Sequence, residues 1–219
     1  MSTYTGKVVP GGPPAVRELT HLIITKASVG PRDNNTYVLR CRDTGTEVVI
    51  DAAAEPDRIL ALCGEGPLTH VVTTHRHQDH WQALADVIAR TNARTIAHAA
   101  DASAISVRID ELVADGDQFH VGSAPLEVIH LVGHTPGSIA LLYDDPTGPP
   151  HLWTGDSLFP GGVGHTRGNK DDFEELLANV TTKLFDRLPD ETWVYPGHGN
   201  DTTLGAERPS LPEWRQRGW

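Results

Sequence analysis

Cysteine is scarce in this sequence of 219 residues, which contains only Cys41 and Cys63. The two are not spaced as a metal site or a disulfide framework requires, so we expect small buried apolar side chains in a protein of the reducing cytoplasm. Long apolar runs are also missing, and we expect neither a signal peptide nor a membrane span. Lys and Arg number 18 against 29 Asp and Glu, and the net charge of -11 argues against nucleic-acid binding.

What remains is the composition of one globular domain covering residues 1–219, with 38% hydrophobic residues and many glycines and prolines for turns. Residues 1–20 are rich in Pro and Gly, and we expect a surface arm or a partly mobile tail there. Short runs of β-branched residues then predict an antiparallel meander. Its strands are expected at residues 22–26, 36–40 and 47–50.

Helical and extended patterns alternate through the rest of the chain. We expect Asp171 to cap the most clearly amphipathic helix, which continues to Phe185. The other expected helices cover residues 55–63, 81–91 and 99–106, and the other expected strands cover residues 68–74, 95–97, 126–131, 138–143, 151–156 and 193–195.

The densest chemical signal is the segment from Thr74 to His80, which holds three histidines and one aspartate directly after an apolar strand. Imidazole and carboxylate groups are common ligands of Zn²⁺, Fe and Mn²⁺. His75 and His77 stand two residues apart, so both rings can point the same way from an extended chain. Asp79 and His80 follow and can face a second point. The pattern predicts half of the ligands for two neighbouring metal ions.

Three later residues have the placement of the missing ligands, because each follows an apolar strand and lies beside glycine. His134 lies between Gly133 and a Thr-Pro-Gly turn, Asp156 ends the strand beginning at His151, and His198 is framed by two glycines. A carboxylate has two oxygens, so Asp156 could bridge two metals. Asp51 also ends a strand. It is either a strand-end cap or a group that accepts hydrogen bonds from the metal-binding loop.

The polar segment Gly161–Asn169 is too hydrophilic for the core, and we interpret it as a loop bordering a substrate pocket. Its His165 and Arg167, together with Tyr195 from the last strand, are the candidate pocket residues. We interpret His98, His120 and His130, which have no glycine frame, as ordinary core or surface residues.

Taken together, these motifs resemble those of the metallo-β-lactamase-fold hydrolases, and among them the short glyoxalase II-like members. The resemblance is carried, in family order, by Thr74-His75-Arg76-His77-Gln78-Asp79-His80, Gly133-His134, Thr154-Gly155-Asp156 and Gly197-His198. It implies an α+β fold built as a four-layer αβ/βα sandwich, in which two mixed β-sheets are flanked by helices and the site lies at one edge.

The resemblance also implies a division of the ligands between two divalent metal ions. His75, His77 and His134 are expected to bind the first ion, with Asp156 bridging to the second. Asp79, His80 and His198 complete the second site, and the family's aspartate at the end of an early strand corresponds to Asp51. Zinc is the first choice of metal, with iron and manganese as alternatives.

Similar enzymes imply a metal-bridging hydroxide that attacks the carbonyl of a small-molecule thioester, ester or lactone, with Asp79 steering the nucleophile. Full-length glyoxalase II carries a C-terminal helical domain for which little chain remains after His198, and the loop from Gly161 lacks the family's usual cysteine. The expectation is therefore a thioester or lactone hydrolase of undefined specificity. A mononuclear iron persulfide dioxygenase using His75, His134 and Asp156 is the alternative.

Overall fold

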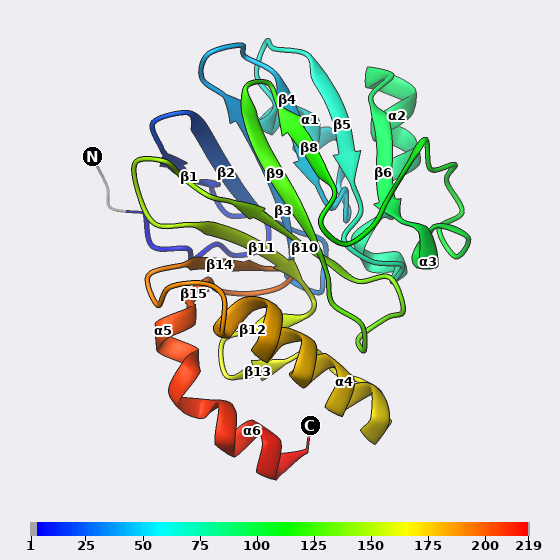
Figure 1. Cartoon of the computed structure of the whole chain (residues 1–219). Coiled ribbons are helices and arrows are strands. Elements are labelled where there is room, and N and C mark those ends of the chain that lie inside the picture. The colour runs from blue at the N-terminus through cyan, green and yellow to red at the C-terminus, as the bar shows by residue number, and fades with distance from the viewer. Residues whose placement is uncertain (1–3, 219) are drawn as a thin grey trace.

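Two mixed β-sheets face each other, and helices cover the outer face of each sheet (Figure 1). The computed structural model describes residues 4–218. The first sheet has the strand order β1-β2-β3-β4-β5-β6-β7. Its strands are β1 (Ala15–Glu18), β2 (Leu22–Val29), β3 (Asn34–Cys41), β4 (Glu47–Ile50), β5 (Leu68–Val72), β6 (Arg94–His98) and β7 (Glu111–Val113).

The second sheet has the strand order β15-β14-β11-β10-β9-β8. Its strands are β8 (Gln118–Val121), β9 (Ala124–His130), β10 (Ile139–Tyr143), β11 (His151–Gly155), β14 (Trp193–Pro196) and β15 (Thr202–Thr203). A separate hairpin is formed by β12 (Leu158–Phe159) and β13 (Gly162–Val163). The helices are α1 (Pro56–Leu62), α2 (Leu84–Thr91), α3 (Ala99–Ala102), α4 (Lys170–Val180), α5 (Leu204–Glu207) and α6 (Leu211–Arg217).

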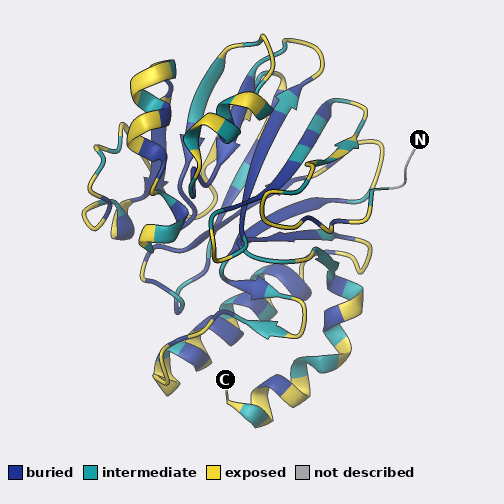
Figure 2. Cartoon of the chain, turned by 180° about the vertical axis from the view of Figure 1, so that it is seen from behind, coloured by how far each residue is buried: buried dark blue, intermediate teal, exposed yellow. Residues whose placement is uncertain are grey.

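Three clusters of apolar side chains fill the spaces between these layers. They form because successive side chains along each strand point to alternate faces of the sheet. In β11, Trp153 faces the cluster between the sheets, whereas Leu152 faces the cluster under α4 and α6. A third cluster joins the outer face of the first sheet to α1 and α2, for example through Val71 and Leu84. Successive side chains of a strand point to opposite faces, so each strand serves two layers. The helices correspondingly present buried faces to the sheets and exposed faces outward (Figure 2). The four-layer sandwich expected from the sequence is confirmed.

Strand direction explains why the site forms at one edge. Strands β4 to β7 run parallel to one another, and so do β11 and β14. The carboxyl ends of parallel strands meet at the same edge of a sheet, where their loops form ligand sites. The loops after β4, β5, β11 and β14 carry Asp51, the segment from Thr74 to His80, Asp156 and His198, respectively.

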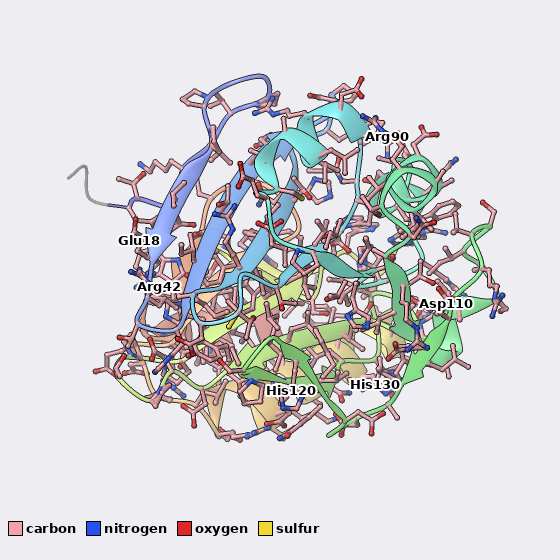
Figure 3. The ribbon with its side chains drawn as sticks, turned by 90° about the horizontal axis from the view of Figure 1, so that it is seen from above. Glu18, Arg42, Arg90, Asp110, His120 and His130 are labelled. Atoms are coloured by element: carbon pink, nitrogen blue, oxygen red, sulfur yellow. The ribbon has the colours of Figure 1, made fainter. Side chains whose placement is uncertain are left out.

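The meander expected at the start of the chain is present, because β1 to β4 pair antiparallel in sequence. For the first twenty residues the sequence predicts a surface arm or a partly mobile tail, and the structure describes this segment from Tyr4 onward. Ala15–Glu18 forms an edge strand on β2, and Glu18 pairs with Arg42 at 3.1 Å (Figure 3). Tyr4 bonds Asp201, so this segment is part of the packed body; residues 1–3 lie outside the described range.

Two helix predictions also need correction. Asn169, not Asp171, caps α4: its side-chain oxygen accepts the backbone N–H groups of Asp171 and Asp172. The helix expected at residues 99–106 ends at Ala102. Between residues 4 and 218, no helix has both the length and the apolar character needed to cross a membrane.

Candidate metal centre

The loop after β5 crosses the edge of the first sheet and is bonded to the second sheet. Ile139 at the start of β10 donates its N–H to the carbonyl oxygen of Thr74 at 2.9 Å. A single 3-10 turn, Gln78–His80, then brings Asp79 and His80 round beside the extended segment of His75 and His77. The sequence motif is therefore folded back on itself, and its four candidate ligands face one region.

The first predicted ligand set is brought together from two loops. The ligand atoms of His75, His77 and His134 all lie within 4.8 Å of one another. Nδ1 of His77 lies 2.9 Å from Nε2 of His134. Three imidazole nitrogens at this spacing can bind one ion together.

The second predicted set is also brought together. The ligand atoms of Asp79, His80 and His198 lie within 4.8 Å of one another, and the Nε2 atoms of His80 and His198 are 3.2 Å apart. Asp79 Oδ2 lies 3.7 Å from His198 Nε2. A carboxylate with two imidazoles is a donor set suited to Zn²⁺, Fe or Mn²⁺.

Asp156 lies between the two sets. Its Oδ2 atom is 3.6 Å from His134 Nε2 and 3.5 Å from His198 Nε2, while Oδ1 is 3.4 Å from His80 Nε2. The carboxylate thus faces ligands of both sets at once. This is the geometry that a bridging ligand requires.

Backbone carbonyls fix the orientation of two of the rings. Nδ1 of His134 donates to the carbonyl oxygen of His165 at 2.9 Å, and Nδ1 of His198 donates to that of Arg32 at 2.9 Å. A proton held on Nδ1 leaves the Nε2 lone pair free to bind a metal. Both Nε2 atoms point to Asp156.

Asp51 fixes the other two buried rings. Its carboxylate accepts the N–H and the hydroxyl of Thr74, both at 2.8 Å, and Nδ1–H of His80 at 2.8 Å. The Thr74 hydroxyl, which donates to Asp51, accepts from Nδ1 of His75 at 3.1 Å. Asp51 has a φ of 56°, an uncommon value for a residue with a side chain, and the three bonds hold it there.

The residues fit a metal ion because buried ligand atoms are left unpaired by the protein. Nε2 of His75 and Oδ1 of Asp156 are buried and accept no hydrogen bond from any described residue. Leaving a buried polar atom unpaired costs roughly 1–3 kcal/mol, so such atoms call for a partner. A divalent cation bound by these imidazoles and carboxylates would be that partner.

The charge states of four of the candidate ligands also suit a cation. Burial lowers the pKa of His75 well below its usual value and lowers that of His134 to about 4, so both rings are neutral. Burial alone would raise the pKa of Asp156, but the neighbouring rings of His80 and His198 hold it well below its usual value. Asp79 shows the same balance, with burial opposed by His80 and the Asn34 amide, which lower its pKa. The carboxylates are therefore ionised at neutral pH.

Two of the three candidate pocket residues border this centre. Arg167 Nη2 lies 3.1 Å from His77 Nε2, and both line a groove together with His134. His165 touches His134 through its carbonyl oxygen, and its exposed side chain lines a second, adjacent cavity that also includes Phe159. The loop expected at the pocket therefore does border the ligand cluster.

Tyr195 does not line a pocket, and this expectation is wrong. Its side chain is 0% exposed, stacks on Trp153 with ring centroids 5.0 Å apart, and bonds His151 through its hydroxyl at 2.8 Å. The alternation of β14 turns Tyr195 into the cluster between the sheets and leaves the following loop to carry His198.

Two asparagines that look like ordinary turn residues in the sequence hold the second ligand set. The Asn34 amide donates to the carbonyl oxygen of Asp79 at 3.0 Å and lies 3.3 Å from His198 Nε2. The Asn35 amide donates to the carbonyl oxygens of Pro196 and Gly199, on either side of His198. Asparagine is uncommon in strands, and its presence in β3 is the signal that could have indicated this role.

A buried lysine supports the loop that carries His198 from the interior of the protein. Lys26 is 0% exposed, and its Nζ donates to the carbonyl oxygens of Gly6 and Gly199 and to Asp201. Asp201 also accepts the Tyr4 hydroxyl at 2.8 Å. A lysine in a strand gives no sign of such burial, so this network could not be found from the sequence.

Comparison with known proteins decides the family. The model of the metallo-beta-lactamase superfamily matches residues 29–198, which include all seven candidate ligands. The chain belongs to this superfamily. A hydroxyacylglutathione hydrolase of Polaromonas sp. is 37% identical over 167 residues, which cover 75% of this chain and 62% of that protein. The chain therefore spans less than two thirds of the length of this relative.

Solved structures of superfamily proteins show the same architecture. ETHE1 from Myxococcus xanthus is 31% identical, with a TM-score of 0.75 over 88% of this chain and 84% of that one. TTHA1623, solved in a di-iron-bound form, is also 31% identical, with a TM-score of 0.71 over 85% of this chain and 98% of that one. The metallo-beta-lactamase fold and the implied divalent metal ions agree with the ligand geometry described above.

Proposed function

We propose that this superfamily member is a dinuclear metal-dependent hydrolase that cleaves a thioester, such as a hydroxyacyl derivative of a low-molecular-weight thiol, or a related ester or lactone. The observation that carries the proposal is the position of Asp156, within 3.6 Å of ligand nitrogens from both sets. The likeness to hydroxyacylglutathione hydrolase at 37% identity supports the thioester over other carbonyl substrates.

In this proposal the first ion is held by His75, His77 and His134, the second by Asp79, His80 and His198, and both by Asp156. Divalent ions in such a pair supply an acidified water nucleophile and polarise a carbonyl oxygen. Zinc is the first choice, and the di-iron-bound form of TTHA1623 keeps iron as an alternative beside manganese.

The chain's own groups then have separate tasks. Asp79 is ionised, and its Oδ2 lies 3.7 Å from His198 Nε2, where it can accept a hydrogen bond from an attacking water and orient it. The carbonyl oxygens of His165 and Arg32 keep the rings of His134 and His198 aligned, with Nε2 of each ring facing Asp156. Arg167 and His165 border the opening, and we propose that they contact the substrate beyond its reacting carbonyl.

The direct test is a panel of thioesters and lactones assayed with protein loaded separately with Zn²⁺, Fe²⁺ or Mn²⁺. We expect hydrolysis of at least one hydroxyacyl thioester, with two metal equivalents per chain at full activity. Loss of activity on removal of one equivalent would support the dinuclear centre. Hydrolysis of no carbonyl substrate in any metal form would overturn the proposal.

The second candidate is the mononuclear iron persulfide dioxygenase. It is favoured by the position of Asp156 Oδ2, which lies 4.0 Å from His75 Nε2 and 3.6 Å from His134 Nε2 and so completes a three-ligand set. Metal analysis of protein purified without added metal separates the two candidates. One iron per chain, with oxygen uptake on glutathione persulfide, would replace the hydrolase.

A further inference from the structure

Asp101 connects the two loops that carry the first ligand set. It lies in the short helix α3, directly after β6, and is 0% exposed. Its Oδ2 accepts the backbone N–H of Arg76 at 2.9 Å and the hydroxyl of Thr135 at 2.5 Å, while Oδ1 accepts the N–H of Gly137 at 2.9 Å. One carboxylate therefore takes three hydrogen bonds from two separate loops.

The donors are the immediate neighbours of the ligands. Arg76 stands between His75 and His77, and Thr135 follows His134. The two loops are joined at this carboxylate, and the ring atoms of His77 and His134 face each other at 2.9 Å. A shift of Asp101 would move both loops relative to each other.

Gly137 allows the close approach that these bonds need. A Cβ atom at residue 137 would lie 2.7 Å from the backbone nitrogen of Asp101 and 2.8 Å from its Cβ. These distances are too short for any side chain, so the loop can reach Asp101 only with glycine at this position. The glycine after His134 thus has a packing reason, separate from the turn that it forms.

This site requires a side chain whose two terminal atoms both accept hydrogen bonds, as the two oxygens of a carboxylate do. An asparagine at residue 101 has one oxygen and one NH₂ group. In one orientation the NH₂ group meets the N–H of Arg76, and in the other it meets the N–H of Gly137. Either way, one backbone N–H loses its acceptor and faces a second donor, although the side chain keeps its size.

We infer that Asp101 is a positioning residue that sets the spacing of His75 and His77 from His134, and thereby the affinity of the first metal site. The inference rests on the proposed dinuclear centre. Asp51 differs from Asp101 because it supports one ring of each set, His80 directly and His75 through the Thr74 hydroxyl. The groups that bond Asp101 instead flank ligands of the first set.

The test compares metal binding in four purified variants without any assay of activity. Asp101→Asn removes one link, and Thr135→Val removes the hydroxyl bond while keeping the side-chain shape. Thr135→Ser retains the hydroxyl and removes only the methyl group. Asp110→Asn is the matched control: Asp110 also accepts a backbone N–H and a hydroxyl, both from Thr95, but it lies at the periphery of the molecule, directly before β7 (Figure 3).

Cadmium NMR of metal-loaded protein gives the readout, since a three-imidazole site and a site with one carboxylate and two imidazoles give separate resonances. We expect Asp101→Asn and Thr135→Val to weaken binding at the three-imidazole site by about 10–100-fold. The second resonance is expected to persist, and Thr135→Ser and Asp110→Asn to resemble the wild type.

Two results would overturn the inference. One is wild-type affinity at the first site in both Asp101→Asn and Thr135→Val. The other is equal weakening of both sites, which would indicate a general effect on the fold. If Asp101→Asn does not fold, the pair Thr135→Val and Thr135→Ser decides. Absence of hydrolysis in the wild type would contradict the proposed function and leave this metal-binding result intact.

Discussion

The Nζ atom of Lys26 lies 2.6 Å from Oδ1 of Asp201, and both side chains are 0% exposed. The pair is buried beneath the loop of His198, because Nζ also donates to the carbonyl oxygen of Gly199 at 2.7 Å. A buried ion pair contributes little net stability, but removing one partner leaves an unpaired charge in the interior.

Replacement of Lys26 by Met should therefore lower the free energy of unfolding by roughly 3–5 kcal/mol. The double variant Lys26→Met/Asp201→Asn should recover part of that loss, since no charge then remains unpaired. Urea unfolding of metal-free protein, analysed as a double-mutant cycle, measures the coupling. Strictly additive losses would show that the two charges do not depend on each other.

Loss of a metal ligand should abolish activity while the fold persists. We expect His77→Ala and Asp156→Ala each to lower metal content and to reduce turnover to background, with an unchanged far-UV circular dichroism spectrum. His120→Ala is the control, because His120 is an exposed histidine on β8 that belongs to neither ligand set (Figure 3). Wild-type turnover in His77→Ala would place the active site elsewhere.

Stability of the metal-free protein should fall as the pH falls from about 6.5 to about 4, in part because of His151. Burial, followed by the nearby Arg17, lowers the pKa of this ring from 6.5 to about 4. Between these values the unfolded chain binds a proton that the folded protein excludes, so acid favours unfolding.

His151→Phe removes this group, and we expect its stability relative to the wild type to rise by up to about 1.4 kcal/mol for each pH unit of acidification within that window. Chemical unfolding in the presence of a chelator, at several pH values, measures the difference. His120→Phe should leave the pH dependence unchanged. A wild-type slope in His151→Phe would mean that His151 is protonated in the folded protein.

Gly197 should tolerate no side chain. A Cβ atom there would lie 2.2 Å from Oδ1 of Asp156 and 2.7 Å from Cε1 of His80. Gly197→Ala should therefore displace a ligand of each ion and lower metal affinity at least tenfold, as measured by chelator competition. At Gly148 a Cβ would come no closer than 3.2 Å to Asp145, and Gly148→Ala should bind metal normally.

The clustering of the candidate ligands could be predicted from the sequence because four of them follow an apolar strand within a few residues. The end of a strand is a local signal, and His75, His134, Asp156 and His198 all carry it. The same reasoning failed for Tyr195, where one residue of register decides between the core and the loop. The alternation of β14 places Tyr195 inward, and a run of three residues is too short to set that register.

Apart from Asp51, the supporting groups could not be predicted, because their partners are distant in the chain. Asp101 bonds Thr135 and Gly137, and Lys26 bonds Gly199 and Asp201; no spacing or period connects these positions. Strands β7 and β8 were missed for a different reason. They have three and four residues, which is too short for an alternating pattern to be recognised as a strand.

The candidate ligands come from loops of both sheets: the loop after β5 carries four, and the loops of the second sheet carry three. An ion held by both can bind only the folded arrangement, so its binding free energy adds to the free energy of unfolding. A free metal concentration one hundred times the dissociation constant adds about 2.7 kcal/mol per site. The unfolding midpoint measured against free metal concentration is therefore a titration of the centre, and it requires no knowledge of the substrate.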